Sequence, residues 1–367
     1  MRSAIILLDK ENDLKFAFRP VLDRTLVELV VRELHNADVL DVSILSEDTN
    51  HNINGAKMVS SLNDAIKHLD AMNSDVLIID ALYPNLTKDT YAKMFEHANS
   101  RIHKTRTIKL SVKDIINIKN IKFEDINVSE DELKTINTNL ELYEYNQKLR
   151  REINLKHLEN DVNIFDIDHT FIGPDVKIES GVSIYPNVYL NGETVIKENS
   201  TIFGDSYLKD AKIGANTSII SSRITDSEVK NNVTIGPNSH LRMNSIVEDN
   251  VRIGNYVEFK NTHFGIKSRC AHLTYLGDSE VGNDVNIGCG VVTVNYDGAH
   301  KFQTKIGDHS FIGSNSNLIA PIEVGENAVV AAGSTIYQNV ESNDMAIARS
   351  YQTIKKGRGY SYVNKEK

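Results

Sequence analysis

Cysteine is scarce in this sequence of 367 residues, and long apolar stretches are absent from it. The two cysteines, Cys270 and Cys289, form no Cys-x-x-Cys pair and supply no disulfide framework, which favours a reducing compartment. The apolar run at 4–8 is short and is not followed by the cleavage pattern of a signal peptide. No stretch approaches the roughly 20 apolar residues of a membrane-spanning helix. We therefore expect a cytoplasmic protein without membrane insertion.

Positive charge is in deficit as well. The chain has 41 Lys and Arg against 50 Asp and Glu, which gives a formal net charge of −9. A chain this acidic is not expected to bind nucleic acid or an anionic membrane surface. A small anionic substrate remains compatible, because a pocket can be locally positive on an acidic protein.

Glycine is nearly absent from the first part of the chain. Residues 1–172 contain only Gly55, whereas the other nineteen glycines follow from Gly173 onward. Before this step, strand and helix patterns alternate, which is typical of a small, parallel, doubly wound α/β domain. The predicted strands are 4–8, 39–45 and 75–79, and the predicted helices are 25–35, 65–71 and 88–98. The segment 100–129 gives no clear pattern, and 140–158 predicts a connecting helix.

After the step, aliphatic residues recur every six positions. They are Ile172, Ile178, Ile184, Leu190, Ile196, Ile202 and Leu208, then Ile235, Leu241, Val247, Ile253 and Phe259, and finally Ile306, Ile312, Leu318, Val324, Val330 and Ile336. Six is neither the helical nor the strand period. It fits an all-β, left-handed parallel β-helix of hexapeptide repeats, a triangular coil in which every side contributes one inward aliphatic residue.

Three sides make one turn of such a coil, so each aliphatic residue stacks on its equivalent three repeats further on. A small or β-branched residue two positions earlier fits the tight inner corner. The aliphatic residue is commonly followed by glycine, as at Gly173, Gly214, Gly236 and Gly254, and Gly or Asn permits positive φ at the turn. We expect eight to ten turns. The period is interrupted between Thr293 and Ile306, where the polar segment 294–301 predicts a projecting loop, a good place for functional residues.

The interrupted region contains the groups that amide formation from a thioester needs. Such a reaction requires a base near neutral pKa, donors for the developing oxyanion and cations for a substrate phosphate. Arg242 and Lys260 are separated by three whole repeats and should stack one turn apart on the same face. His272 is the candidate base, although a lone histidine is more often structural. Neutral donors are supplied by Asn286, Asn295, Tyr275 and Tyr296.

A metal enzyme of the γ-carbonic anhydrase class can use the same coil, but it needs clustered histidine ligands. None of the coil histidines are paired at close spacing, so no metal site is predicted. These histidines are His240, His263, His272, His300 and His309.

Three motifs resemble one known family closely. They are His272-Leu273-Thr274-Tyr275-Leu276-Gly277-Asp278, Val285-Asn286-Ile287-Gly288-Cys289-Gly290 and Val294-Asn295-Tyr296-Asp297-Gly298. They resemble the acetyltransferase half of the bacterial bifunctional enzymes that make UDP-N-acetylglucosamine, by uridyltransfer to N-acetylglucosamine 1-phosphate after N-acetylation of glucosamine 1-phosphate. The resemblance covers roughly residues 130–357.

The resemblance implies a role for each matching residue. His272 would be the general base that deprotonates the 2-amino group of glucosamine 1-phosphate. The sugar-phosphate ligands would be Arg242, Lys260, Tyr275, Asn286 and Lys301. Acetyl-CoA would be the co-substrate, with Asn295 and Tyr296 on the loop between sugar and acetyl group and with Cys289, Ser314, Ala332 and Arg349 as further contacts. Such sites lie between subunits, so a homotrimer is expected.

Three positions at two places depart from the family pattern, and all concern loop geometry. The usual Arg-Pro-Gly is Arg242-Met243-Asn244, and the glycine before the histidine is Ala271. Neither change removes a functional side chain. Cys289 is expected to be a structural inner residue rather than a nucleophile, because the family transfers the acetyl group directly.

The N-terminal part departs much further from the family. In the relatives a uridyltransferase domain begins with a strand and a glycine-rich loop that approaches the UTP phosphates. Here the strand is followed by Asp9-Lys10-Glu11-Asn12-Asp13-Leu14-Lys15, which has no glycine and three acidic residues. Asp80-Ala81-Leu82-Tyr83-Pro84 stands where the family has its metal-binding Gly-Asp-Val-Pro. The sugar-binding half of that domain is missing, so it is expected to be truncated and degenerate.

The sequence thus predicts four segments. They are a degenerate nucleotidyltransferase-like domain (1–128), a connecting helical segment (129–160), a β-helix acetyltransferase domain (161–357) and a C-terminal tail (358–367). The predicted activity is acetyl transfer to glucosamine 1-phosphate, a step toward UDP-N-acetylglucosamine and the peptidoglycan of the cell wall. Mg²⁺ is expected only if uridyltransfer survives. Three alternatives remain: a bifunctional enzyme, a non-catalytic trimeric scaffold or regulator, and an acetyltransferase for another amino sugar nucleotide.

Overall fold

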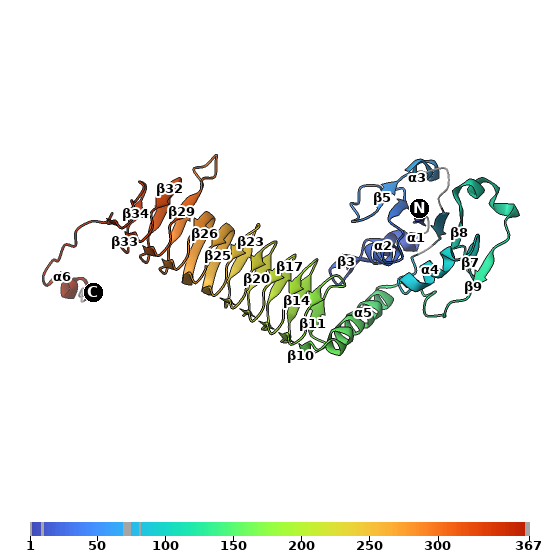
Figure 1. The fold of residues 1–367 in the computed structure, drawn as a ribbon, viewed down its shortest axis with the longest axis horizontal. Helices are drawn as coiled ribbons and strands as arrows, with labels where there is room; N and C mark the ends of the chain where they lie inside the picture. Colours follow the sequence, from blue (N-terminus) through green and yellow to red (C-terminus); the bar gives the residue numbers. More distant parts are fainter. Residues whose placement is uncertain (1, 9–10, 69–74, 81, 364–367) are drawn as a thin grey trace. The chain divides into compact units, whose positions relative to one another are not determined.

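The computed structural model describes residues 2–8, 11–68, 75–80 and 82–363 (Figure 1). The chain divides into two compact units, Met1–Arg151 and Glu152–Lys367. This division falls inside the long helix α5 (Asn139–Glu159), and the boundaries at 128–129 and 160–161 stay predictions. Asp9, Lys10 and Ala81, which mattered for the uridyltransferase comparison, lie outside the described residues.

The first unit is built on a mixed sheet, which among the described residues has seven strands in the order β5-β4-β1-β6-β8-β7-β9. Their bounds are β1 (Arg2–Leu7), β4 (Asp41–Leu45), β5 (Lys57–Val59), β6 (Asp75–Ile79), β7 (Ser100–Ile102), β8 (Ile108–Ser111) and β9 (Glu124–Ile126). The first four in this order pair in parallel, as predicted. However, β8 is antiparallel to both β6 and β7, so the sheet is not parallel throughout.

Helices cover both faces of this sheet. The described elements are α1 (Glu11–Ala17), α2 (Leu26–Asn36), α3 (Leu62–His68), α4 (Lys88–Phe95), the 3₁₀ helix η1 (Val112–Asn120) and the hairpin of β2 (Pro20–Val21) and β3 (Arg24–Thr25). One core contains Ala4 and Ile6 with residues of α2 and α4, and the other contains Ile5 with Ala65 of α3. The doubly wound prediction is therefore confirmed for this unit.

Local sequence signals explain where these helices begin and end. Thr25 caps α2, because its hydroxyl accepts from the backbone of Glu28 while the Glu28 carboxylate accepts from the Thr25 N–H at 2.7 Å. The helix predicted at 65–71 begins earlier, at Leu62, and its last three residues lie outside the described ones. The helix predicted at 88–98 ends at Phe95.

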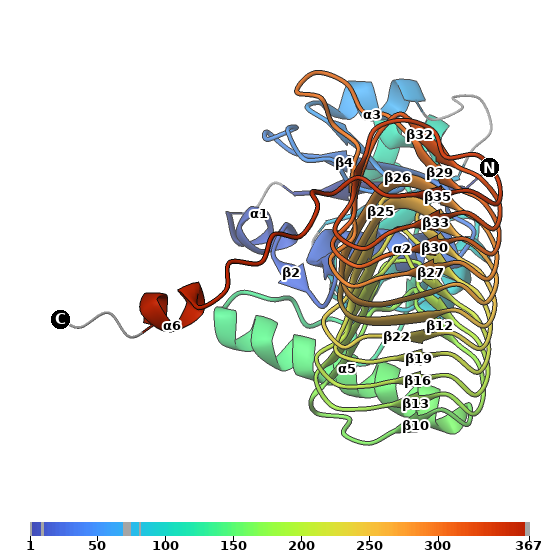
Figure 2. The same ribbon diagram turned by 90° about the vertical axis from the view of Figure 1, so that its left-hand side faces the viewer.

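The second unit is a coil of short parallel strands, stacked turn upon turn in Figure 2. The described strands are β10 (Asn163–Ile164), β11 (Thr170–Ile172), β12 (Lys177–Ile178), β13 (Ser183–Ile184), β14 (Val188–Asn191), β15 (Val195–Ile196), β16 (Thr201–Ile202), β17 (Tyr207–Lys209), β18 (Lys212–Ile213), β19 (Ser218–Ile219), β20 (Arg223–Thr225), β21 (Glu228–Val229), β22 (Thr234–Ile235), β23 (His240–Arg242), β24 (Ile246–Val247), β25 (Arg252–Phe264), β26 (Arg269–Val281), β27 (Asn286–Ile287), β28 (Val292–Val294), β29 (Thr304–Ile306), β30 (Phe311–Ile312), β31 (Asn317–Ile319), β32 (Ile322–Val324), β33 (Val329–Val330), β34 (Thr335–Ile336) and β35 (Met345–Ala346), followed by the short helix α6 (Arg358–Val363).

The period of six is the period of the coil core. Most strands pair with the third strand after them, so Ile184 lies opposite Ile202 and Leu190 opposite Leu208. All the periodic aliphatic residues are buried except Ile178, which is partly buried against the same core. From Ile164 to Ala346 one register line makes ten steps among the described residues, the upper end of the eight to ten turns expected.

At the corners, the prediction of positive φ is confirmed for asparagine but not for most of the glycines named for it. Left-handed backbone is supplied mostly by Asn and Asp, for example Asn199 at φ 57° and Asn216 at φ 55°. Of the four glycines predicted to supply it, only Gly236 has positive φ. Gly254 is needed for another reason, because a Cβ on it would lie 1.9 Å from the carbonyl oxygen of Ala271 on the next turn. It permits close approach of two turns.

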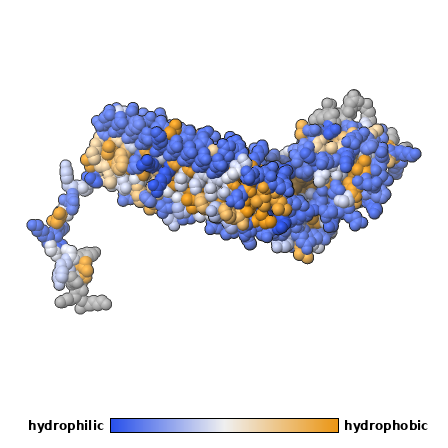
Figure 3. Space-filling view, turned by 60° about the horizontal axis from the view of Figure 1, so that its bottom comes forward, coloured by the Kyte–Doolittle hydropathy of each residue, from blue (hydrophilic) through white to orange (hydrophobic). Residues whose placement is uncertain are grey.

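Apolar side chains also gather outside the core, over the first turns of the coil (Figure 3). Rings in this part form ladders along the outer surface: Tyr185 stacks on Phe165 at 4.4 Å and on Phe203 at 4.7 Å between ring centroids. Phe171 and Tyr189 form a second stack at 4.5 Å. These pairs add to the stability that in-register stacking provides.

Removing a large core side chain tests this packing. Phe259 is fully buried and contacts the ring of Phe264 at 4.9 Å. We expect Phe259→Ala to lower the free energy of unfolding by about 3–5 kcal/mol, because it removes apolar contact and leaves a cavity. Chemical denaturation followed by circular dichroism measures the change. Phe311→Ala is the control, since Phe311 is 48% exposed on the outer surface; an equal loss in both variants would contradict the assigned core.

Candidate functional site

Two of the predicted cationic residues lie side by side on one face of the coil. Arg242 of β23 is directly opposite Lys260 of β25, which confirms that their spacing in the sequence stacks them one turn apart. The Arg242 guanidinium donates to the Glu258 carboxylate from Nε at 3.1 Å. The Lys260 side chain is buried, and its ammonium group lies 3.3 Å from Asp278 Oδ2 on the next turn.

The predicted loop projects from the coil after β28 and brings further polar groups to this cluster (Figure 1). Asn295, at its start, is buried and donates from Nδ2 to the same Asp278 oxygen. Tyr296 forms an isolated antiparallel bridge with Lys301, which closes the loop. The Asp297 carboxylate caps the loop tip by accepting from the backbone of Ala299 and His300 at 2.8 and 2.6 Å. Asp278 thus links Lys260 to the loop.

The charges in this cluster act strongly on one another. Contact with Lys301 and the negative charge of Asp278 raise the pKa of Lys260. The neighbouring Lys260 lowers the pKa of the exposed Lys301. Burial acts to raise the pKa of Asp278, but hydrogen bonds from Asn261 and Asn295 and the charge of Lys260 outweigh it and lower that pKa. Asp278 is therefore a carboxylate at neutral pH, held among cations suited to binding an anion.

The candidate base lies at the other end of the strand that carries Asp278. His272 is exposed on β26, and its Nδ1 lies 2.9 Å from Oδ1 of Asn255 on the preceding turn. Tyr275 lies on the same strand between His272 and Asp278, opposite Glu258. β26 thus joins the base candidate to the cationic cluster within one chain.

The residues predicted to contact acetyl-CoA continue the line on which His272 lies. Register pairs run from Cys270 to Ile287, Ile312 and Val330 on successive turns. His272, Cys289, Ser314 and Ala332 each follow one of these by two positions. Arg349 joins the line, because its guanidinium donates to the Ala332 carbonyl. Cys289 is exposed, so the expectation that it is an inner residue was wrong. Cys270 is the buried cysteine, and burial raises the pKa of its thiol to about 12.

Asn286, a predicted sugar-phosphate ligand, does not lie beside Arg242 and Lys260 within a single chain. It lies opposite Arg269, before the corner on which His272 lies, whereas Arg242 and Lys260 lie on the face after that corner. Its partner on the next turn is Phe311.

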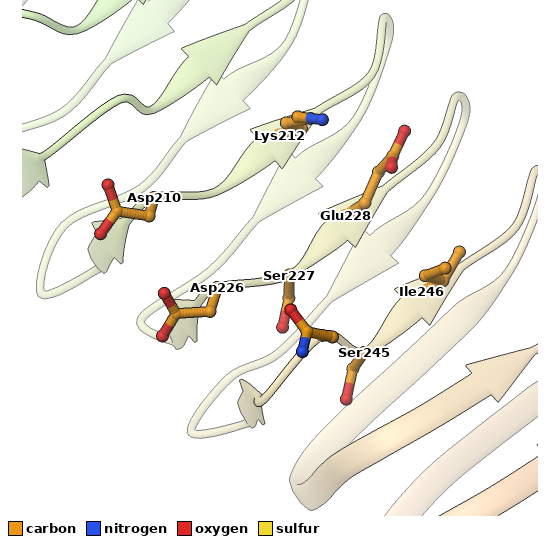
Figure 4. Close-up of a pocket in the computed structure, with 8 residues that line it drawn as sticks. Asp210, Lys212, Asp226, Ser227, Glu228, Ser245 and Ile246 are labelled. Atoms are coloured by element: carbon orange, nitrogen blue, oxygen red, sulfur yellow. The ribbon is translucent and has the colours of Figure 1, made fainter.

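Grooves lie along the surface of the coil. One of about 360 Å³ adjoins the cationic cluster, and its lining includes Asn244, Asn261, Asp278 and Lys301. Another of about 320 Å³ lies earlier on the coil. Figure 4 shows Lys212 of β18 and Glu228 of β21 side by side on successive turns in this earlier groove, which includes none of the predicted site residues.

Three partners of the site residues escaped prediction: Asn255, Glu258 and Asp278. Asn255 stands one turn before His272, and Asp278 stands one turn after Lys260. A spacing of three whole repeats counted from Lys260 would have found Asp278. Asn255 and Glu258 stand 17 and 16 residues from His272 and Arg242, so the same spacing misses them. Among the described residues, no group of three or more His, Cys, Asp or Glu side chains is placed to hold a metal ion. No helix of the described part is long and apolar enough to cross a bilayer.

Comparison with known proteins gives a family model that matches part of the coil, together with solved and curated relatives. Residues 303–338 match the family model described as the hexapeptide repeat of succinyl-transferase. A solved UDP-N-acetylglucosamine acyltransferase from Francisella novicida aligns with a TM-score of 0.34 and 20% identity, covering 50% of this chain and 66% of that chain.

Two curated relatives are much more similar in sequence. Bifunctional protein GlmU of Caldicellulosiruptor saccharolyticus is 47% identical over 245 residues, which is 66% of this chain and 53% of the relative. Its counterpart in a Geobacillus species is 49% identical over 220 residues, which is 60% of this chain and 48% of the relative. The chain spans about half the length of the curated relatives it matches. These matches confirm the resemblance that the coil motifs indicated: over about two thirds of its length, the chain is similar to bifunctional protein GlmU.

Proposed function

We propose that the coil transfers the acetyl group of acetyl-CoA to the amine of glucosamine 1-phosphate, giving N-acetylglucosamine 1-phosphate and free CoA. The observation that carries this proposal is the placement of a histidine and a cluster of three cations on adjoining turns. His272 and Asp278 share β26, and Asp278 contacts Lys260. A base for an amine and cations for a phosphate are what this substrate requires. The likeness to bifunctional protein GlmU supports the same reaction.

In the proposed reaction, His272 accepts a proton from the sugar ammonium group through Nε2. The freed amine nitrogen then attacks the thioester carbonyl carbon and forms the carbon–nitrogen bond as the carbon–sulfur bond breaks. The nitrogen loses its second proton, which the departing CoA thiolate takes up, and the protonated His272 returns its proton to solvent. Arg242, Lys260 and Lys301 hold the phosphate and so fix the position of the amine relative to the thioester. No covalent intermediate on the protein is needed, so the exposed thiol of Cys289 serves as a contact rather than a nucleophile.

The complete site is proposed to form between copies of the chain in a homotrimer. Asn286 lies on the face that precedes the His272 corner, away from Arg242 and Lys260. An Asn286 contributed by a neighbouring coil would meet the cations across an interface. Such an arrangement also places the line of His272, Cys289 and Ser314 against a second surface.

The N-terminal unit is proposed to have lost uridyltransferase activity. Its sheet is present, but the segment directly after β1 contains no glycine. Gly55 is the only glycine in the sequence of this unit. Asp80, at the end of β6 where a metal-binding carboxylate would be expected, is engaged within the protein. It accepts from the Thr107 hydroxyl at 2.7 Å and lies 3.6 Å from the Arg106 guanidinium.

Removal of the proposed base gives the first test. We expect His272→Ala to lower kcat for thiol release from acetyl-CoA with glucosamine 1-phosphate by about 10²–10⁴-fold, the range typical of general-base catalysis. His309→Ala serves as the matched control, because His309 is an exposed coil histidine that contacts Asp284 rather than the site. Full activity in His272→Ala would contradict the proposed mechanism, and activity only with another amino sugar would redirect the substrate assignment.

The cationic cluster predicts a characteristic pH dependence. Lys301→Met is expected to raise the KM for glucosamine 1-phosphate about 10-fold to 100-fold, since a charge-assisted hydrogen bond to phosphate is lost. Because Lys260 lowers the pKa of Lys301, the wild-type KM should begin to rise with pH below the range in which an ordinary lysine deprotonates. In Lys301→Arg this rise should disappear, because arginine stays charged.

Initial rates measured from neutral to alkaline pH follow the effect. Lys305→Met is the control, an exposed lysine on β29. A KM that changes equally in Lys305→Met and Lys301→Met would contradict the phosphate role.

Product analysis tests the state of the N-terminal unit. Full-length protein given glucosamine 1-phosphate, acetyl-CoA, UTP and Mg²⁺ should accumulate N-acetylglucosamine 1-phosphate and no UDP-N-acetylglucosamine. Chromatography coupled to mass spectrometry separates the two. In a second arm, His272→Ala receives N-acetylglucosamine 1-phosphate directly, so that uridyltransfer is measured without acetyl transfer. Formation of the UDP-sugar in either arm would overturn the proposed loss.

A further inference from the structure

Asn255 and His272 face each other on neighbouring turns. They are register partners in the longest strand pair of the coil, β25 with β26, and Asn255 Oδ1 lies 2.9 Å from His272 Nδ1. Asn255 is half-buried and His272 is exposed. Gly254, directly before Asn255, lets the two turns approach closely, since any Cβ there would meet the Ala271 carbonyl. The hydroxyl of Ser239 on the preceding turn donates to the Gly254 carbonyl, which fixes the backbone that carries Asn255.

This contact determines which ring nitrogen is available as a base. A neutral imidazole has one N–H and one lone pair, and an amide oxygen can only accept. With Oδ1 facing Nδ1, the ring proton lies on Nδ1 and the lone pair lies on Nε2. An amide turned the other way would donate to Nδ1, place the proton on Nε2 and leave no outward lone pair for the substrate amine.

We propose that Asn255 is a positioning residue that holds His272 in the Nδ1–H tautomer, so that Nε2 is the proton acceptor in acetyl transfer. This inference rests on the proposed function of the coil. Asn255 acts through His272 and touches no reacting atom.

The neutral amide suits this task better than a carboxylate does. A carboxylate in the same place would also accept from Nδ1–H, but its negative charge would favour the imidazolium form and so raise the pKa of the histidine. More of the base would then carry its proton near neutral pH. The position one turn after His272 on the same line is Cys289, so the line carries no carboxylate next to the ring on that side. An amide orients the ring without raising the pKa of the histidine in this way.

Two substitutions separate the effects of orientation and charge. Asn255→Ala removes the acceptor, and we expect kcat to fall about tenfold while both KM values stay within about twofold. Asn255→Asp keeps an acceptor-only oxygen, so kcat should recover toward the wild-type value at alkaline pH. The acidic limb of its pH–rate profile should shift upward by about one pH unit, because the added charge favours the protonated base.

Nitrogen-15 NMR of histidine-labelled full-length protein reads the tautomer directly and needs no substrate. The His272 signals, assigned by their loss in His272→Ala, should show protonated Nδ1 in wild type and Asn255→Asp above the histidine pKa. They should show a loss of this preference in Asn255→Ala. Asn317→Ala is the matched control, because the Asn317 side chain also forms a hydrogen bond to the next turn, here as the donor to Thr335 Oγ1 at 3.3 Å, but lies away from His272. Equal thermal midpoints for the two alanine variants exclude a folding defect as the cause.

Wild-type protein with the proton on Nε2 of His272 would overturn the inference, as would an Asn255→Ala variant with unchanged kcat and pH profile. These outcomes differ from failure of the proposed function. If His272→Ala retained full acetyl transfer, the proposed function would fail, whereas the tautomer seen by NMR would still report whether Asn255 orients the ring.

Discussion

Everything in the second unit depends on the in-register stacking of inward aliphatic residues. Because Ile184 lies on Ile202 and Leu241 on Phe259, the outward residues between them are also held in lines along the coil. A polar residue therefore has a fixed neighbour one turn away, whatever its own chemistry. The core supplies the stability, and the lines supply positions at which side chains far apart in sequence meet.

Stacking creates an electrostatic difficulty that Asp278 resolves. Arg242, Lys260 and Lys301 gather at one place, and the repulsion between them is visible in the lowered pKa of Lys301. Asp278 offsets part of this repulsion by contacting Lys260, and it also accepts from Asn295 at the base of the projecting loop. One carboxylate thus keeps the cations together and orders the loop, while the net positive charge remains available for an anion.

The sequence predicted those features that repeat, and missed those that depend on local register. Ile306 to Ile336 each carry the same signal, so the coil was predictable from the period alone. Asn255 was not, because the turns in this region differ in length and the partner of His272 depends on that variation. The segment 100–129 contains three short strands, two of which pair antiparallel, and strands this short give no period. The prediction that Gly254 has positive φ was wrong, since this glycine instead permits two turns of the coil to approach closely.

The first unit is held together by packing on the faces of its sheet. Its cores lie on the two faces of the sheet, where Ala4 and Ile6 pack on one side and Ile5 on the other. Ligands of doubly wound sheets bind elsewhere, at the carboxyl ends of the strands. Of the residues soon after β1, Phe16 and Ala17 of α1 are buried in one of these cores. At the end of β6, the Asp80 carboxylate accepts from the Thr107 hydroxyl and lies 3.6 Å from the Arg106 guanidinium, so it has partners within the chain.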